Sequence, residues 1–185
     1  MDMPPPPFII KRIAVFSVSI RRNAYCSGER SSLLLQKIEI AFDCSEKVFQ
    51  VMKFADQVSR REVYLAKGQT MKMKAKHFEK AGTVRADWGE IIVDAMKFCI
   101  AEKYRQSAEF RQALEESRGL FIVEDQTSFP KKSPDTWGAK LSGDGTLYVG
   151  PNLMGRLLME LRDSGCQLRW SLPRDATLFQ ESLRV

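Results

Sequence analysis

The segment 86–104 most strongly constrains the fold, because its apolar side chains recur with the 3.6-residue period of an α-helix. Asp87 stands at its start and Glu90 follows three residues later, which is a capping-box pattern that predicts the beginning of a helix. The apolar positions form one face, which we assign to the core. They are Ile91, Ile92, Ala95, Met96, Cys99, Ile100 and Tyr104.

Shorter periodic segments complete the predicted fold. Asn152 is a candidate cap for a helix with an apolar leucine and methionine face, and the long polar segment 125–151 is predicted to be a functional or mobile loop. Together these segments predict a single α+β domain, predominantly helical, with a small β-sheet built from the N-terminal strands and the 120–123 strand. We predict further helices over 45–59, 107–117 and after Asn152, and strands within 8–20, 33–42, 120–123 and around Leu168 and Trp170.

The charge balance favours a negatively charged partner without requiring one. The 185 residues carry a formal net charge of +6, which suits nucleic acid or a phosphorylated small molecule but is equally explained by solubility. A basic run, Lys67–Lys80, is either the rim of an anion site or an ordinary solvated face. No apolar run reaches the roughly 18–20 residues that span a bilayer, so we expect no membrane partner.

The cysteines and the histidine limit the possible metal chemistry. Because Cys26, Cys44, Cys99 and Cys166 form no CxxC pair, we expect neither a zinc knuckle nor a thioredoxin-like site, but reduced thiols in a cytoplasmic protein. The single histidine, His77, excludes a multi-histidine metal site, and we expect it on the surface. No cofactor is implied.

One stretch has the composition of a catalytic site. On a helix capped by Ser45, the side chains of Glu46, Gln50 and Lys53 lie at i, i+4 and i+7 and share one face. A carboxylate and an amine on one stripe suit acid–base or nucleophilic chemistry. The alternative is a surface network of i, i+4 pairs that contributes only a few tenths of a kcal/mol.

Further motifs occur in a fixed order along the chain. Phe49 and Gln50 are followed by Lys53-Phe54, then by Arg85-x-Asp87-Trp88, then by Lys103-Tyr104. Trp137-Gly138 and the pattern Gly-x-Asn-x-x-Gly-x-x-Leu-Met-x-x-Arg over 150–162 come last. In this order the motifs resemble the NADAR (YbiA-like) family, most strongly over 25–163, within a predicted domain of 8–185 that follows a proline-rich tail, 1–7.

The resemblance implies cleavage of an N-glycosidic bond between ribose and a nitrogen base. Its implied substrate is ADP-ribosylated guanine, in nucleic acid or as a nucleotide, and Glu46, Lys53 and Asp135 are the implied catalytic residues. Glu46 would stabilise the positive charge that develops on the sugar, and Lys53 would act as an acid or form a Schiff base. Substrate-binding roles are implied for Ser27, Phe49, Gln50, Arg85, Trp88, Trp137, Gly138 and Asn152.

Two departures from the family pattern keep alternatives open. The usual Leu-Ser-Asn-Phe is replaced by Cys26-Ser27-Gly28-Glu29, and Asp135 stands two residues before Trp137 instead of three. A non-catalytic module that binds ADP-ribose or nucleic acid is therefore a second class of function. Within the enzymes, intermediates of riboflavin biosynthesis are the alternative substrates. A third alternative is an interaction protein that uses Pro4–Pro7.

Overall fold

The computed structural model of the chain describes residues 8–10, 18–21, 39–129, 133–165, 167–179 and 183. Its contacts divide the chain into two compact units. The α1 unit, named after helix α1 (Ser45–Met52), consists of Val15–Gln106 and Trp170–Val185. The α6 unit, named after helix α6 (Leu153–Asp163), consists of Met1–Ala14 and Ser107–Arg169. Each unit is described separately below.

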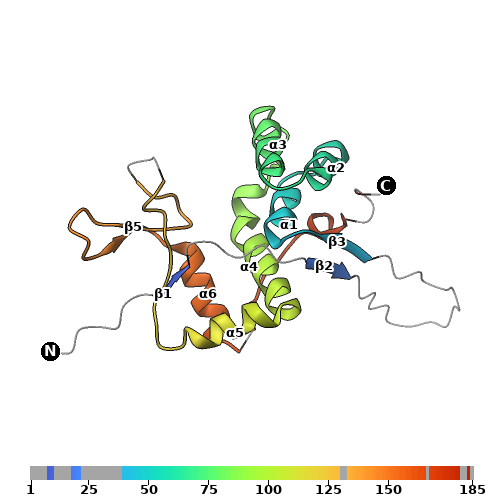
Figure 1. The fold of residues 1–185 in the computed structure, drawn as a ribbon. Coiled ribbons are helices and arrows are strands. Elements are labelled where there is room, and N and C mark those ends of the chain that lie inside the picture. The colour runs from blue at the N-terminus through green and yellow to red at the C-terminus, as the bar shows by residue number, and fades with distance from the viewer. Residues whose placement is uncertain are drawn as a thin grey trace, which may run out of the picture. The chain divides into compact units, whose positions relative to one another are not determined.

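The α1 unit is helical, and its helices pack on α1 (Figure 1). Strand β2 (Val18–Arg21) pairs with β3 (Glu39–Phe42) in antiparallel register, with Val18 opposite Phe42. Phe42 is buried at the end of β3 and packs edge-on against Tyr64 and Phe179. The other elements of this unit are α2 (Gln57–Leu65), α3 (Gln69–Lys80), α4 (Trp88–Gln106) and the short 3₁₀ helix η1 (Arg174–Thr177).

The predicted helix 45–59 is interrupted, and this part of the prediction is wrong. Helix α1 ends at Met52, and α2 begins at Gln57 because the Asp56 carboxylate accepts a hydrogen bond from the Ser59 N–H as its N-cap. Between the two helices, Phe54 forms an isolated antiparallel bridge with Val84. The cap of α1 also differs, because Cys44 takes the N-cap position and Ser45 is already helical.

Helix α4 confirms the helix predicted over 86–104. Ile91, Ala95, Cys99 and Ile100 are buried on one face, as the periodicity predicts. Lys103 of the same helix is also fully buried, and this burial lowers the pKa of its amine to about 8. The predicted capping box is wrong at Asp87, because its carboxylate binds the Arg85 guanidinium.

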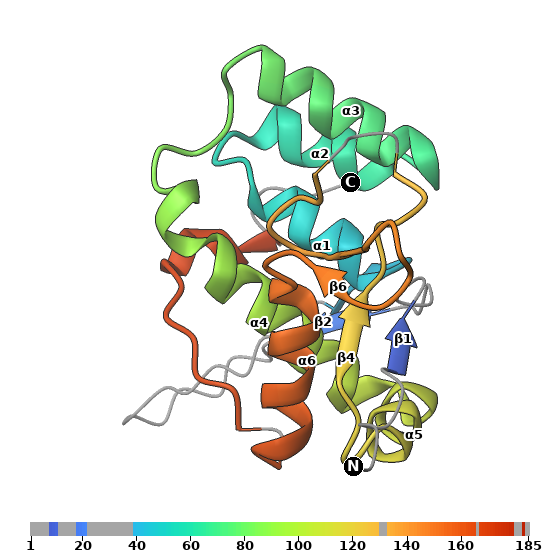
Figure 2. The same cartoon turned by 90° about the vertical axis from the view of Figure 1, so that its left-hand side faces the viewer.

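The α6 unit places a short parallel pair of strands against α6 (Figure 2). Strand β1 (Phe8–Ile10) runs parallel to β4 (Ile122–Glu124), with Phe8 opposite Ile122. Helix α5 (Ala108–Glu116) begins at Ser107, whose hydroxyl accepts a hydrogen bond from the Phe110 N–H. The core face of α6 includes Leu157, Leu158 and Leu161, as predicted.

The sheet is more divided than the sequence predicts. The predicted pairing of an N-terminal strand with the 120–123 strand is present as β1–β4, whereas β2 pairs with β3. The predicted loop 125–151 contains a small hairpin, β5 (Lys140–Leu141) with β6 (Tyr148–Val149). The strand predicted around Leu168 and Trp170 is absent from the described residues 167–173. In the described part of the chain, no helix is both long and apolar enough to cross a membrane.

Candidate active site

The charged residues predicted on α1 are paired with α3 and not with each other. The Glu46 carboxylate lies 2.7 Å from the Lys72 amine, and the Lys53 amine binds the Glu79 carboxylate. Lys72 and Glu79 are seven residues apart on α3, as Glu46 and Lys53 are on the α1 segment. Two ion pairs with the same spacing therefore hold these two segments in register. The Glu46 side chain is 44% exposed, so its carboxylate is open to solvent and to a ligand.

Lys53 is more enclosed and lies against aromatic rings. Its side chain is 15% exposed, and its amine lies 5.9 Å from the centre of the Phe49 ring. The Phe49 ring in turn packs on Trp88, with 5.2 Å between ring centres. The structure therefore brings together three of the predicted residues, a cation and two aromatic rings, at the end of α1.

Gln50 adds a polar atom without a partner. The Gln50 Oε1 atom is buried and makes no hydrogen bond to any described residue. Buried polar atoms in native proteins are nearly always hydrogen-bonded, so an exception at a predicted site residue requires a reason. A ligand that donates a hydrogen bond to this amide would supply one.

Arg85 is held at the same end of α1 by the backbone. Its N–H donates to the Lys53 carbonyl at 2.9 Å, which continues the bridge between Phe54 and Val84. Its guanidinium binds Asp87 at 2.5 Å and Asp175 at 3.1 Å, and these carboxylates, Asp87 first, raise the pKa of Arg85. The Nη1 atom is buried without a hydrogen-bond partner among the described residues. Two carboxylates thus position Arg85, while one of its nitrogens makes no hydrogen bond to the described residues.

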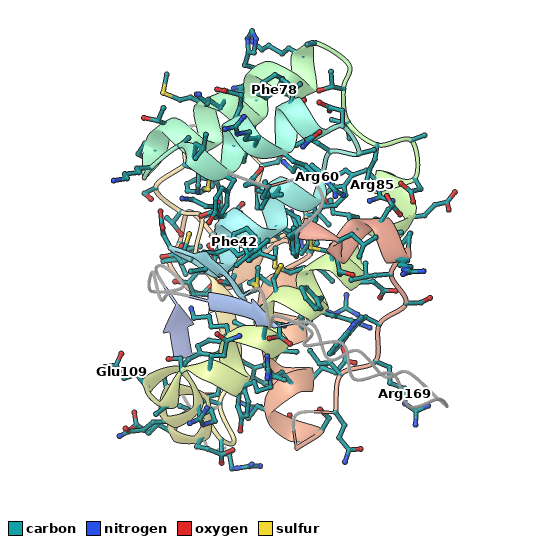
Figure 3. The ribbon with its side chains drawn as sticks, turned by 90° about the vertical axis from the view of Figure 1, so that its right-hand side faces the viewer. Phe42, Arg60, Phe78, Arg85, Glu109 and Arg169 are labelled. Carbon is teal, nitrogen blue, oxygen red and sulfur yellow. The ribbon has the colours of Figure 1, made fainter. Side chains whose placement is uncertain are left out.

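Arg60 lies in the same network (Figure 3). It is buried, donates from Nε to the Phe54 carbonyl and from Nη2 to the Asp175 carbonyl, and burial lowers its pKa. Asp175 therefore binds Arg60 with its backbone and Arg85 with its side chain. The segment around η1 is in this way tied to the site residues of the α1 unit.

The remaining predicted residues belong to the α6 unit, where Asp135 organises a turn. Its Oδ1 atom accepts hydrogen bonds from the Gln126 side chain at 2.6 Å and from the Trp137 N–H at 2.9 Å. The Asp135 N–H donates to the Gln126 Oε1 at 2.9 Å. Asp135 is exposed, so its carboxylate reaches the surface while one oxygen holds the turn.

This turn lies against the start of α6 and occupies its backbone donors. The N–H groups of Asn152, Leu153 and Met154 donate to the carbonyls of Gly138, Thr136 and Trp137 at 3.0, 3.1 and 3.0 Å. These three N–H groups are therefore engaged by the chain itself and are not available to bind a phosphate. The Asn152 side chain is also engaged, because it donates to the Ile122 carbonyl and accepts from the Glu124 N–H.

Two glycines in this region are required by close packing. A Cβ on Gly155 would lie 2.1 Å from the Ile122 carbonyl oxygen, and one on Gly138 would lie 2.5 Å from the Gln126 side chain. Gly138 and Asn152 thus have structural roles in the turn. Trp137 is half-buried beside them, and Ser27 lies outside the described residues.

Sequence reasoning missed the partners of the site residues. Lys72, Glu79 and Asp175 complete the ion pairs of Glu46, Lys53 and Arg85, yet they come from distant parts of the chain. The seven-residue spacing of Lys72 and Glu79 repeats that of Glu46 and Lys53 with opposite charges. That repetition is the signal from which two of the three could have been found.

Comparison with known proteins identifies the family. The NADAR domain model matches residues 11–164. The N-glycosidase YbiA of Escherichia coli K12 is 28% identical over 119 residues, which cover 64% of this chain and 68% of YbiA. The N-glycosidase YbiA of Shigella flexneri serotype 5b is 26% identical over 139 residues, which cover 74% and 80%.

The fold agrees with these sequence matches. The NMR structure of the Escherichia coli protein YbiA superposes with a TM-score of 0.52 at 27% identity, and the match covers 67% of each chain. The family model covers parts of both units, including the segments that carry Glu46, Lys53, Trp88 and Trp137. The chain therefore belongs to the NADAR domain family.

Proposed function

We propose that this protein is an N-glycosidase that removes ADP-ribose from ADP-ribosylated guanine, in nucleic acid or in nucleotides. The proposal is supported by family membership and by the names of the relatives. The observation that carries it is the end of α1, where the mostly enclosed Lys53 amine lies 5.9 Å from the centre of the Phe49 ring and Phe49 packs on Trp88. The buried Gln50 oxygen of the same helix has no hydrogen-bond partner among the described residues.

The reaction breaks the bond between the anomeric carbon of the ribose and a guanine nitrogen. Water adds its hydroxyl to that carbon, and the guanine nitrogen takes a proton. Positive charge develops on the sugar during cleavage, so a carboxylate close to it lowers the barrier. Glu46 is the proposed carboxylate, because its half-exposed side chain can stabilise this charge or accept a proton from the attacking water.

Lys53 has two chemically distinct roles open to it. As an acid, its ammonium donates the proton that guanine needs on leaving. As a nucleophile, its neutral amine attacks the anomeric carbon, guanine departs, and water later hydrolyses the resulting Schiff base. Either role requires the ion pair with Glu79 to open, and the 38% exposure of the Glu79 side chain allows that movement.

Binding roles are proposed for the residues around Lys53 and for those of the turn. The half-buried Trp88 presents a ring on which a base or ribose can stack, and Arg85 Nη1 and Gln50 Oε1 offer a donor and an acceptor. In the α6 unit, Asp135 is proposed as a second carboxylate that acts through Oδ2, since Oδ1 holds the turn. Phe49 and Ser27 are proposed as substrate-binding residues of the α1 unit, and Trp137, Gly138 and Asn152 are proposed as substrate-binding residues of the α6 unit.

The test is release of ADP-ribose from guanine-ADP-ribosylated DNA, measured by chromatography for wild type and for Glu46→Gln. Glu115→Gln is a matched control, because Glu115 is also a half-exposed carboxylate in an ion pair, with Arg118 at 2.6 Å. We expect release that is lost in Glu46→Gln and kept in Glu115→Gln. Equal activity of all three proteins would remove Glu46 from the mechanism.

The role of Lys53 is decided by borohydride trapping. A Schiff base gives a covalent adduct on Lys53, whereas an acid role gives none. Lys53→Arg keeps the positive charge but neither forms the adduct nor donates a proton, so activity of this variant would argue for simple charge stabilisation instead of either role. An adduct that persists in Lys53→Ala contradicts the assignment to Lys53.

The same assays separate the alternatives. Hydrolysis of riboflavin-biosynthesis intermediates without release from DNA would favour the metabolic substrate. ADP-ribose binding without turnover of either substrate, unchanged by Glu46→Gln, would favour the binding module.

A further inference from the structure

We propose that the groove between α2 and α3 binds single-stranded nucleic acid, so that the strand flanking the modified guanine is held by this part of the α1 unit. The inference deepens the proposed function and rests on it in one respect, that the substrate is a polynucleotide rather than a free nucleotide.

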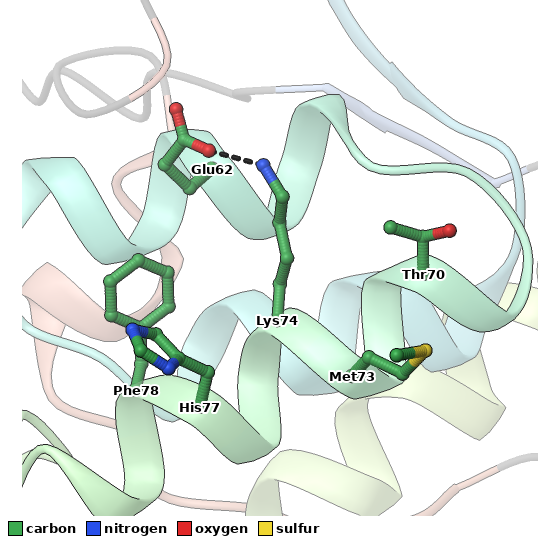
Figure 4. A pocket seen from close by; sticks show the side chains of 6 residues that line it. All are labelled: Glu62, Thr70, Met73, Lys74, His77 and Phe78. Carbon is green, nitrogen blue, oxygen red and sulfur yellow. Dashed lines mark hydrogen bonds and ion pairs between the residues drawn. The ribbon is translucent and has the colours of Figure 1, made fainter.

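The groove has a volume of about 440 Å³, within the range of small-ligand sites (Figure 4). Its surface is mostly apolar although it is open to solvent. The His77 and Phe78 rings lie at one end with 5.4 Å between ring centres, and Met73, 71% exposed, lies toward the other. The lining residues are Glu62, Thr70, Met73, Lys74, His77 and Phe78.

The single polar link across the groove is the ion pair between Lys74 of α3 and Glu62 of α2. A planar base that enters the groove therefore meets ring and thioether surface, with one charged pair available for its edge. Stacking of this kind is tolerant of sequence, because every base has a π-face.

The charges beside the groove are positive and uncompensated. Within the fully described segment 57–82, both glutamates, Glu62 and Glu79, are paired with lysines, whereas Lys76 and Lys80 form no ion pair. On a helix, Lys80 lies on the stripe of Met73 and His77, and Lys76 lies one turn after Met73. Two free amines therefore follow the edge of the apolar groove.

An apolar groove with aromatic rings and a positive edge matches the two parts of a single strand, its bases and its phosphates. A duplex hides its base faces and would leave Met73 and His77 exposed. An apolar peptide would gain nothing from Lys76 and Lys80. Charge complementarity therefore selects single-stranded nucleic acid as the occupant.

The test is fluorescence anisotropy of a labelled twelve-nucleotide thymidine strand with the full-length protein over a range of salt concentrations. Lys76→Ala/Lys80→Ala should weaken binding about tenfold at low salt and reduce the salt slope by about 1.4, because each phosphate contact to a single strand contributes about 0.7. Arg169→Ala/Arg174→Ala removes two exposed charges elsewhere and serves as the matched control.

His77→Ala tests the stacking surface separately. It should weaken binding about tenfold while leaving the salt slope unchanged. Wild-type affinity in both groove variants, or an equal loss in the control, would overturn the proposal and leave the groove to a protein partner. Because the strand is unmodified, its binding does not depend on hydrolysis. A protein that binds the strand but releases no ADP-ribose from any substrate would contradict the proposed function and leave the groove assignment intact.

Discussion

The end of α1 and the turn before α6 carry predicted site residues, but they use their polar groups in opposite ways. In the turn, the Asp135 Oδ1 atom, the Asn152 side chain and the first N–H groups of α6 are satisfied by the chain itself. At the end of α1, Gln50 Oε1 and Arg85 Nη1 are buried and unpartnered among the described residues. We therefore propose that the end of α1 contacts a ligand, whereas the turn stabilises the chain itself.

The largest effect is expected in the first turn of α1, where Glu46→Gln removes the carboxylate but keeps the size of the side chain. Loss of general acid–base or electrostatic catalysis lowers rates by about 10²–10⁴-fold, so we expect kcat to fall by about 10³. Thermal unfolding should change little, because the ion pair of Glu46 with Lys72 is half-exposed. A folded variant with wild-type kcat would contradict the catalytic role proposed for Glu46.

The scaffold character of the turn is tested by Gly155→Ala. The added Cβ meets the Ile122 carbonyl oxygen at 2.1 Å and the Asn152 side chain at 2.5 Å, so backbone must move. Overpacking and loss of the Asn152 hydrogen bonds should cost about 3 kcal/mol of unfolding free energy in urea. Gly89→Ala is the matched control in helix α4, where a Cβ meets nothing within 4 Å. Equal stability of the two variants would contradict this prediction.

Asp135 has a structural role in the turn and a proposed catalytic role, and the variant Asp135→Asn separates the two. The asparagine oxygen can still accept from Gln126 and Trp137, so the melting temperature should stay near that of wild type. If Oδ2 has the proposed catalytic role, kcat should fall by about 10²-fold. A fall in stability with unchanged kcat would instead place Asp135 wholly in the scaffold.

A smaller effect, in stability, is expected from the buried Lys103. Its amine has a pKa of about 8, below its unfolded value, so the unfolded chain binds more protons between these two values and stability rises with pH. Burial raises the pKa of the Cys99 thiol, which has the opposite effect above its ordinary pKa. Comparison with Lys103→Met cancels the Cys99 contribution.

From pH 8 to 9, the unfolding free energy of wild type relative to Lys103→Met should rise by about 1 kcal/mol. Urea titrations of both proteins measure this difference. Parallel pH profiles of the two proteins would show that Lys103 does not titrate in this window.

Local patterns predicted much of the fold because single segments carry their own signals. The apolar period of α4, the helix predicted over 107–117 and the leucine face of α6 are all present. The break between α1 and α2 was missed although Asp56 is a good N-cap, because the apolar residues Val51, Met52 and Phe54 continue without a gap. Phe54 instead pairs with Val84, a contact that no local pattern contains.

The proximity of several proposed site residues was predictable from the sequence, whereas their ion-pair partners were not. Phe49, Lys53 and Trp88 come together at the end of α1, as their shared motif set implies. The pairing of Asp87 with Arg85 competes with helix capping, and sequence alone does not say which of the two interactions the carboxylate makes. The catalytic and binding roles of these residues stay predictions until the variants are measured.

The double attachment of Asp175 has a practical consequence for anyone who shortens this protein. The family match ends at residue 164, yet Arg60 and Arg85 depend on Asp175 for a carbonyl and a carboxylate. A chain cut at the end of the match would keep both buried guanidinium groups but lose the carbonyl and the carboxylate of Asp175 that bind them. We therefore expect that a stable fold needs more of the chain than the segment matched by the family, and that a shortened protein should end after η1.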